Sequence, residues 1–430
     1  MADPKQLPYR IEDLEAQLNI TPSHPPSAKP PPTATAELQL HEKPPLDTLL
    51  NSYDFESVAS RTLAQKTWAF YSSAATDEIT RDANKSNFDR IWWRPRVLKD
   101  VSSVNTRTRI LGCDVQVPLF VSPAAMARLV HPEGEKAMAA ACGSRGVAQT
   151  ISTNASYPVD QILPCAPPDH PFFFQLYVNR DRRASERLLA SLPRGIKAIF
   201  VTVDAPVPGK READERVRAD ESISAPMTGA KALNDKKGGG LGRIMGSYID
   251  ASLTWDDLRW LRSVTDLPIV LKGIQGAADA RLAAEAGVQG IVLSNHGGRS
   301  LDTSPPAVLI LLELQKCAPE VFEKLEVYVD GGVRRGTDIL KCLCLGATAV
   351  GMGRHFLYAL NYGREGVEHF IDVMRDELET SMKMLGITDL SQVHPGFVNT
   401  LEVDHLIPST IDHPYAKWSP KSRAFPKARL

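Results

Sequence analysis

Eight short apolar runs alternate with segments of helical spacing along this chain of 430 residues, and this alternation constrains its fold. Strands that alternate with helices form parallel sheets, and eight such units in succession are the pattern of a (β/α)8 barrel. A doubly wound sheet is the competing architecture, but no Gly-x-Gly-x-x-Gly follows the first run. We therefore predict an α/β fold of the TIM (β/α)8 barrel type. The runs lie at 117–123, 146–152, 172–178, 198–204, 268–273, 290–294, 325–330 and 347–353, and the helical segments between them at 133–144, 158–164, 181–192, 254–265, 275–286, 305–317 and 335–345.

The two ends of the chain differ from the middle. Residues 1–45 are rich in proline and predict an extended N-terminal linker. Residues 46–390 form the predicted barrel unit, which opens with a helical segment over 46–75 and closes with an amphipathic helix over 361–385. Residues 391–430 are again rich in proline. We expect them to form an irregular C-terminal tail, suited to contact with a neighbouring subunit.

One connection is too long for an ordinary barrel loop. Residues 218–249, after the fourth apolar run, are rich in glycine and lysine. Long irregular loops in compact domains are often lids or binding loops. Because loops that follow barrel strands lie at the carboxyl end of the barrel, we expect this connection to lie over the barrel mouth.

Charge and composition narrow the possible partners. The chain carries 50 basic and 51 acidic side chains with no basic stripe, which argues against nucleic-acid and membrane-surface partners. The sequence contains no stretch of 18 apolar residues, so no membrane span is predicted, and its N-terminus shows no signal-peptide pattern. The six cysteines lack metal-ligand spacing, so we expect reduced thiols and no metal site. The final Ala428-Arg429-Leu430 resembles the peroxisomal Ser-Lys-Leu signal, so we expect a peroxisomal or cytoplasmic protein.

Polar residues follow each apolar run, where a barrel carries its active site. The segment 290–299 is the most informative, because its apolar run leads into Ser294, then His296, then Arg299. Histidine exchanges protons near neutral pH, and arginine binds a carboxylate through two parallel hydrogen bonds. Lys272 ends another apolar run and needs an anionic partner if buried.

The loops after the seventh and eighth runs predict a phosphate site. They read Asp330-Gly331-Gly332-Val333-Arg334 and Gly353-Arg354. Glycines let an anion approach backbone N–H groups, and barrel enzymes often bind phosphate at these two loops. One phosphate without a dinucleotide fingerprint favours a mononucleotide.

These motifs resemble the FMN-dependent α-hydroxy acid dehydrogenases and oxidases, the family of glycolate oxidase and the flavin domain of flavocytochrome b2. The resemblance extends from about Leu46 to Gly386. It implies FMN as cofactor, oxidation of an L-2-hydroxy acid to the 2-oxo acid, and a homotetramer. Residues 1–45 are too few and too rich in proline to form the haem domain of the flavocytochromes. This favours O2 as the acceptor with release of H2O2, over an L-lactate dehydrogenase that passes electrons to an external cytochrome.

The resemblance also implies the roles of individual residues. His296 matches the catalytic base, with Asp204 as its carboxylate partner. Arg211 and Arg299 match the two arginines that bind the substrate carboxylate, and Tyr177 matches a substrate-binding tyrosine. Lys272 matches the lysine at the N1 edge of the flavin. The positions that match cofactor contacts are Pro123, Ala124, Ala125, Ser152, Gln175, Thr202, Lys272, Ser294, Asp330, Gly331, Gly332, Arg334, Gly353 and Arg354.

Two substrate-binding positions depart from the family pattern. Phe70 occupies the position of a tyrosine whose hydroxyl contacts the substrate carboxylate, and the adjacent Tyr71 is expected on another face of its helix. Losing one hydrogen bond to a charged group costs about 1.5–3 kcal/mol. Asn154 replaces a larger or apolar residue that contacts the substrate side chain. A specialised biosynthetic intermediate, such as an ester, an amide or a modified 2-hydroxy acid, is therefore an alternative substrate. A third hypothesis, a flavin-binding protein without activity, does not explain a complete base and arginine set.

Overall fold

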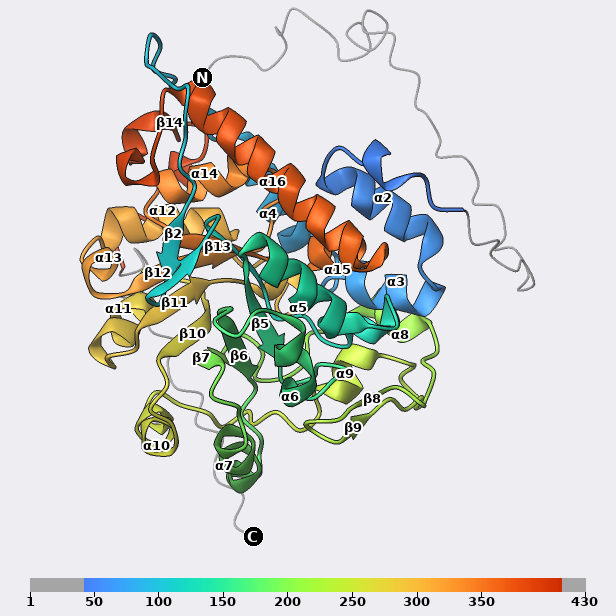
Figure 1. Cartoon of the computed structure of the whole chain (residues 1–430). Coiled ribbons are helices and arrows are strands. Elements are labelled where there is room, and N and C mark those ends of the chain that lie inside the picture. The colour runs from blue at the N-terminus through green and yellow to red at the C-terminus, as the bar shows by residue number, and fades with distance from the viewer. Residues whose placement is uncertain (1–41, 412–430) are drawn as a thin grey trace, which may run out of the picture. The chain divides into compact units, whose positions relative to one another are not determined.

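The computed structural model describes residues 42–411, and in this part of the chain eight parallel strands close into a barrel (Figure 1). The strand order around the barrel is β10-β11-β12-β13-β4-β5-β6-β7. Consecutive barrel strands therefore pair, including β7 with β10 across the long connection, and β13 pairs with β4 to close the barrel. The predicted TIM barrel is confirmed. The strands are β4 (Leu119–Val121), β5 (Ala148–Ser152), β6 (Phe172–Leu176), β7 (Ile196–Thr202), β10 (Ile269–Ile274), β11 (Gly290–Leu293), β12 (Glu326–Asp330) and β13 (Ala349–Met352).

Helices surround the barrel strands, as Figure 1 shows. Each predicted helical segment between two apolar runs contains one of these helices. The closing segment predicted over 361–385 is the long helix α16 (Gly363–Leu385), which packs against α5, α14 and α15. The helices between and after the strands are α5 (Gly134–Arg145), α6 (Val159–Ile162), α7 (Arg182–Ala190), α10 (Asp257–Val264), α11 (Ala277–Glu285), α12 (Ala307–Cys317), α13 (Val321–Lys324), α14 (Gly336–Cys344) and α15 (Arg354–Leu360).

Aromatic side chains fill the inside of the barrel. The rings of Phe173 and Phe200 stack with centroids 5.1 Å apart, and Phe120 meets Tyr328 edge-on at 5.7 Å. All four are essentially fully buried. The hairpin of β2 (Thr108–Ile110) and β3 (Cys113–Val115) adds Ile110 and Val115 to the same cluster at the amino ends of the strands. A filled lumen leaves the carboxyl ends of the strands as the place for a binding site.

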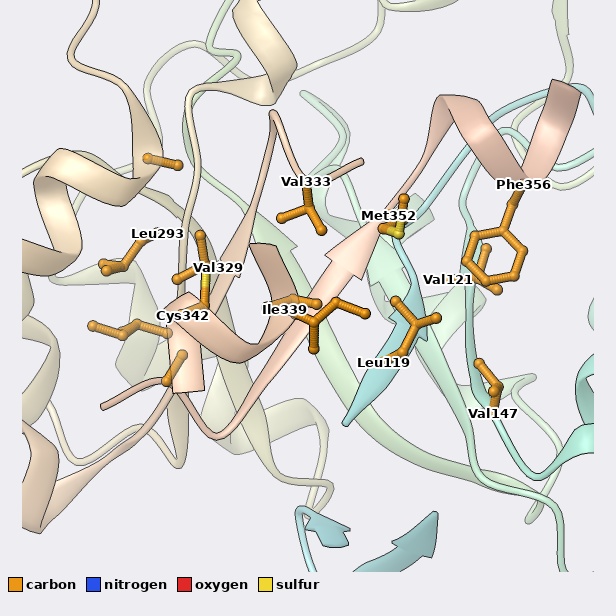
Figure 2. Packing of buried hydrophobic residues seen from close by; sticks show 14 of the residues in the cluster. Leu119, Val121, Val147, Leu293, Val329, Val333, Ile339, Cys342, Met352 and Phe356 are labelled. Carbon is orange, nitrogen blue, oxygen red and sulfur yellow. The ribbon is translucent and has the colours of Figure 1, made fainter. Parts of the chain in front are cut away.

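A second apolar layer joins the strands to the helices outside them (Figure 2). Val329 and Met352 point outward from β12 and β13 towards Ile339 of α14 and Phe356 of α15. Their side chains are at most 2% exposed. Burial of such side chains stabilises the fold by about 1.5–3 kcal/mol each. This layer fixes the loops that leave β12 and β13.

The segments before and after the barrel pack on it. The helical pattern predicted over 46–75 contains two helices, α2 (Ser52–Thr62) and α3 (Gln65–Ser72), followed by α4 (Ile79–Asp89). The strand β1 (Trp92–Trp93) pairs antiparallel with β14 (Val398–Asn399). Phe397 and Val403 belong to the main apolar cluster. Residues 391–411 are therefore part of the barrel unit, and the predicted boundary at residue 390 is not a structural break. The proline-rich residues before 42 and the final tripeptide lie outside the described residues.

The long connection over residues 218–249 contains regular structure. A hairpin of β8 (Ser224–Ala225) and β9 (Ala230–Lys231) is followed by the short helix α9 (Leu241–Met245). The helix α8 (Glu212–Arg216) precedes the connection and contacts α9. We call residues 218–249 the capping loop. Within residues 42–411, no helix is both long and apolar enough to cross a membrane.

Candidate active site

A single pocket at the carboxyl ends of the strands brings the predicted site residues together. Of the predicted residues, only Asp204, Ser294 and Arg334 are absent from its wall. The capping loop closes one side with Gly242, Met245, Gly246 and Ile249, which the sequence did not single out. The predicted residues in the wall are Phe70, Pro123, Ala124, Ala125, Ser152, Asn154, Gln175, Tyr177, Thr202, Arg211, Lys272, His296, Arg299, Asp330, Gly331, Gly332, Gly353 and Arg354.

His296 lies in the pocket wall and pairs with the buried carboxylate of Asp204 behind it. Nδ1 of His296 lies 2.8 Å from Oδ1 of Asp204, whose carboxylate is fully buried. Burial alone raises the pKa of Asp204, but His296 and Lys272 outweigh it, so the pKa is lowered and the carboxylate stays charged. A carboxylate at Nδ1 fixes the tautomer that leaves Nε2 free to accept a proton. Nε2 lies in the wall of the pocket, 3.3 Å from the hydroxyl of Tyr177.

The turn that carries His296 is strained and held from several sides. His296 has a φ of 60°, in the left-handed region that non-glycine residues rarely adopt. The Asn295 side chain accepts a hydrogen bond from the Gly298 N–H at 3.0 Å and donates to Asn84 of α4 at 2.9 Å. Ser294, although outside the wall, accepts a hydrogen bond from the His296 N–H at 3.0 Å. These contacts hold the base in its orientation.

Two guanidinium groups flank Phe70. The guanidinium carbons of Arg211 and Arg299 lie 5.6 and 5.2 Å from the centre of the Phe70 ring. Burial lowers the pKa of both groups, and for Arg299 the nearby Arg211 lowers it further. Nε of Arg211 is buried without a hydrogen-bond partner. No carboxylate within residues 42–411 forms a salt bridge with either group. Two partly buried positive charges with no described carboxylate in salt-bridge contact make a site for an anion.

Tyr71 does not replace the missing hydroxyl at position 70. Its Oη lies 2.8 Å from the carbonyl oxygens of both Ala125 and Met126. The hydroxyl is therefore engaged by the backbone after β4, as the helical spacing predicted. Phe70 presents only a ring to the two guanidinium groups.

Lys272 lies fully buried between two carboxylates. Its Nζ is 3.4 Å from Oδ2 of Asp330 and 4.0 Å from Oδ2 of Asp204, and it donates to Ser294 Oγ at 3.0 Å. Burial lowers the pKa of Lys272, but Asp330 and Asp204 outweigh it and the pKa is raised. Oδ1 of Asp330 and Oδ2 of Asp204 are buried without partners. The ammonium is thus held charged at the pocket wall.

Polar side chains from three neighbouring strands form a second group in the wall. Gln175 Nε2 donates to Thr202 Oγ1 at 2.9 Å, and Ser152 Oγ donates to Gln175 Oε1 at 3.2 Å. Backbone from Pro123 to Ala125 lies in the same wall. Neutral donors and acceptors of this kind suit the polar edge of a flat heterocycle.

The predicted phosphate site is only partly reproduced. Gly331 and Gly332 have φ of 93° and 87°, and a Cβ on Gly332 would lie 2.2 Å from the Asn84 carbonyl oxygen, so the turn requires glycine there. Arg354 lies in the wall, where burial lowers its pKa, and it donates to the Gly297 carbonyl at 2.8 Å. Within residues 42–411 it forms no salt bridge.

Arg334 points elsewhere. Its guanidinium pairs with the carboxylate of Glu56 and lies 5.1 Å over the ring of Tyr53. Both partners come from α2, a helix far away in the sequence. The expectation that Arg334 supplies charge directly to the phosphate site therefore receives no support from its position. Of the two arginines predicted for the phosphate site, Arg354 is the one that lines the pocket.

The sequence model of a family described as FMN-dependent dehydrogenase matches residues 59–400. The chain belongs to this family. The predicted family and the predicted FMN cofactor are thereby confirmed. The pocket fits FMN, because it combines the polar wall of Ser152, Gln175 and Thr202 with an ammonium at Lys272 and a guanidinium at Arg354 that forms no salt bridge within residues 42–411.

Several members of the family resemble the chain over most of its length. L-lactate dehydrogenase (cytochrome) of Saccharomyces cerevisiae is 46% identical over 364 residues, which are 83% of this chain and 61% of that protein. The enzyme of the same name from Wickerhamomyces anomalus is 41% identical, and the match covers 66% of it. The chain thus spans less than two thirds of these two relatives. Glycolate oxidase 3 of Oryza sativa subsp. indica is 39% identical over 362 residues, 83% of this chain and 97% of that protein.

Solved structures of the family have the same fold. The flavin-binding domain of baker's yeast flavocytochrome b2 is 42% identical with a TM-score of 0.75, and the match covers 90% of this chain and 96% of that one. Mandelate oxidase with (S)-4-hydroxymandelic acid is 34% identical with a TM-score of 0.76, and the match covers 82% and 98%. These likenesses support the barrel assignment independently of the strand pattern.

Proposed function

We propose that this chain catalyses the FMN-dependent oxidation of an L-2-hydroxy acid to the 2-oxo acid. One observation carries the proposal: His296, paired with Asp204, shares a pocket with two partly buried guanidinium groups that form no salt bridge with a carboxylate of residues 42–411. A 2-hydroxy acid offers a carboxylate to the guanidinium groups and, one carbon away, a group from which a base can take a proton. Relatives whose names denote lactate, glycolate and mandelate enzymes support the same class of substrate.

Each residue then has a defined part in the reaction. Arg211 and Arg299 bind the carboxylate and orient the 2-carbon towards His296. Nε2 of His296 accepts the proton, and Asp204, 2.8 Å from Nδ1, stabilises the imidazolium that results. The Tyr177 hydroxyl, 3.3 Å from Nε2, is a hydrogen-bond partner for the substrate hydroxyl. Bound FMN would supply the acceptor for the two electrons and the second hydrogen of the substrate, and Lys272 would stabilise negative charge that develops nearby.

We propose O2 as the electron acceptor, with H2O2 as the product. The similarity to glycolate oxidase supports it. The alternative is an L-lactate dehydrogenase that reduces an external cytochrome, supported by the similarity to cytochrome-linked enzymes. The C-terminal Ala-Arg-Leu supports a peroxisomal location. The homotetramer rests on family resemblance alone.

Phe70 favours a second candidate substrate, a 2-hydroxy acid whose carboxylate is modified as an ester or amide. A neutral group does not need the hydroxyl that the family usually supplies at this position. Such a neutral ester or amide group also interacts only weakly with the two guanidinium groups. Arg299→Met separates the candidates, because affinity for a free carboxylate should fall by about 1.5–3 kcal/mol whereas affinity for an ester should change little.

The direct test is anaerobic mixing of the FMN-loaded protein with a panel of L-2-hydroxy acids and their methyl esters. Loss of the yellow flavin absorbance identifies the substrates. Admission of O2 with peroxide detection, compared with reduction of added cytochrome c, identifies the acceptor. If no member of the panel bleaches the flavin, the proposed reaction is wrong.

A further inference from the structure

Asn154 lies in the pocket wall, but its side chain is bonded to the capping loop. Its Oδ1 accepts hydrogen bonds from Thr228 Oγ1 at 3.1 Å and from Tyr248 Oη at 3.2 Å. Its Nδ2 makes a longer contact with the Met245 carbonyl at 3.4 Å. Asn154 is only 5% exposed, so these contacts use the amide where water has little access. One residue just after β5 thus joins both the β8–β9 hairpin and the end of the capping loop to the barrel.

The capping loop in turn packs on Arg211. A Cβ on Gly242 would lie 1.2 Å from Arg211 Nη2, so the α9 backbone lies directly against the guanidinium. The Gly242 N–H donates to Asp214 Oδ2 at 3.0 Å, and Asp214 Oδ1 pairs with Lys66 at 2.5 Å. Because Arg211 has little space beside α9, any movement of α9 changes where its guanidinium can point.

We propose that Asn154 is a positioning residue that holds the capping loop against Arg211 and so fixes the guanidinium that binds the substrate carboxylate. The inference rests on the proposed function. It assigns the amide of Asn154 a contact within the protein instead of a contact with the substrate side chain. The two hydroxyl donors, Thr228 and Tyr248, do not line the pocket. Removing their hydroxyl groups therefore weakens the contact between Asn154 and the capping loop without changing the residues that line the pocket.

The experiment uses the full-length, FMN-loaded protein with Tyr248→Phe, Thr228→Val and the double variant. Tyr157→Phe is the matched control, because its hydroxyl donates to the Pro132 carbonyl at 2.8 Å, outside the capping loop. Thr228→Ser, which keeps the hydroxyl, tests rescue. Two measurements do not depend on turnover: amide hydrogen exchange over residues 240–249, and the Kd for oxalate, a small dicarboxylate, from the flavin absorbance. Trypsin cleavage after the exposed Lys236 and Lys237 reports loop opening.

In the double variant, we expect exchange over 240–249 and tryptic cleavage to be about tenfold faster, since two partly buried hydrogen bonds are lost. The oxalate Kd and the KM for the hydroxy acid should rise about fivefold to tenfold. kcat and the flavin spectrum should stay close to wild type. Tyr157→Phe and Thr228→Ser should match wild type in every measurement.

Unchanged exchange in the double variant overturns the proposal. So does faster exchange with an unchanged oxalate Kd, because the loop would then move without affecting Arg211. These outcomes differ from a failure of the proposed function, in which wild-type flavin is not bleached by any hydroxy acid. If wild type also fails to bind oxalate, the carboxylate site and the positioning role are wrong together.

Discussion

At the scale of single residues, the reactivity of His296 depends on its orientation by Asp204. The 2.8 Å contact at Nδ1 and the left-handed turn leave Nε2 as the only ring nitrogen that faces the pocket. We expect His296→Gln to lower kcat by about 10²–10⁴-fold, because the substitution removes the proton acceptor but none of the predicted FMN contacts. Anaerobic stopped-flow reduction measures the loss, and the visible spectrum shows whether FMN is retained. A kcat within tenfold of wild type would assign the base to another residue.

Phe70 allows a test of the carboxylate site with one added atom. The ring lies between Arg211 and Arg299, so Phe70→Tyr brings a hydroxyl close to an anion held by both. We expect KM for a 2-hydroxy acid to fall about tenfold, since a hydrogen bond to a charged group contributes about 1.5–3 kcal/mol. Steady-state kinetics with an acid and its methyl ester measure the effect. An equal change for both substrates would mean that the hydroxyl does not meet the carboxylate.

The positions of these residues were predictable, but some side-chain directions were not. Because parallel strands bring all their carboxyl ends to one face, the sequence order alone placed His296, Lys272 and Arg299 together. Arg334 has a long, flexible side chain whose guanidinium could pair with more than one anion. It pairs with Glu56, which lies 278 positions away in the chain. Such a choice depends on tertiary contacts that no local pattern encodes.

At the scale of elements, Asp302 fixes the start of α4, the helix that holds the His296 turn through Asn84. Its carboxylate accepts hydrogen bonds from the N–H groups of Thr80 at 2.8 Å and Asp77 at 3.1 Å. Burial opposes ionisation of Asp302, but hydrogen bonds from backbone N–H groups, chiefly those of Thr80 and Thr303, outweigh it and lower its pKa to about 2. A carboxyl group with a lowered pKa stabilises the fold above its ordinary pKa near 4, and this contribution disappears as the pH falls towards 2.

We therefore expect Asp302→Asn to lower the free energy of unfolding by about 1 kcal/mol at pH 7, a value reduced by solvent screening. The difference from wild type should narrow as the pH falls from 4 towards 2. Urea unfolding of both proteins across this range measures it. A difference that is independent of pH would show that the charge of Asp302 does not contribute.

The β1–β14 pair makes residues beyond 390 part of the barrel unit. Phe397 is 7% exposed, whereas Leu401 in the same segment is 75% exposed. We expect Phe397→Ala to lower the free energy of unfolding by about 3 kcal/mol because it leaves a cavity, and Leu401→Ala to have almost no effect. Denaturant unfolding of the two variants measures both values. Equal, small effects would mean that this segment is a detachable tail. The sequence missed this pairing, since two-residue strands show no periodicity.

At the scale of the whole molecule, the sequence predicted the barrel because eight apolar runs repeat one local pattern. The closure of the site was harder to predict, because the capping loop acquires its hairpin and α9 from contacts such as those of Gly242 with Asp214. The finished pocket collects positive charge from distant parts of the chain. Arg211, Arg299 and Arg354 all line it and are partly buried, and desolvation lowers the pKa of each. An anion bound among these guanidinium groups should therefore be stabilised by their charge.

FMN should consequently stabilise the whole fold, and its phosphate should account for much of the effect. Ligand binding to the folded state adds RT ln(1 + [L]/Kd), which is about 2.7 kcal/mol at 100 Kd. We expect removal of FMN to lower Tm, and Tm to rise again with added FMN. Riboflavin has the same ring without the phosphate, so it should bind at least tenfold more weakly and stabilise less at equal concentration. Calorimetric scans against both ligands, for wild type and Arg354→Met, measure this.

Arg354→Met should weaken FMN binding but leave riboflavin binding nearly unchanged, because only FMN carries the group that Arg354 would bind. If both ligands lose affinity equally, Arg354 acts on the ring or the fold, and the phosphate site lies elsewhere.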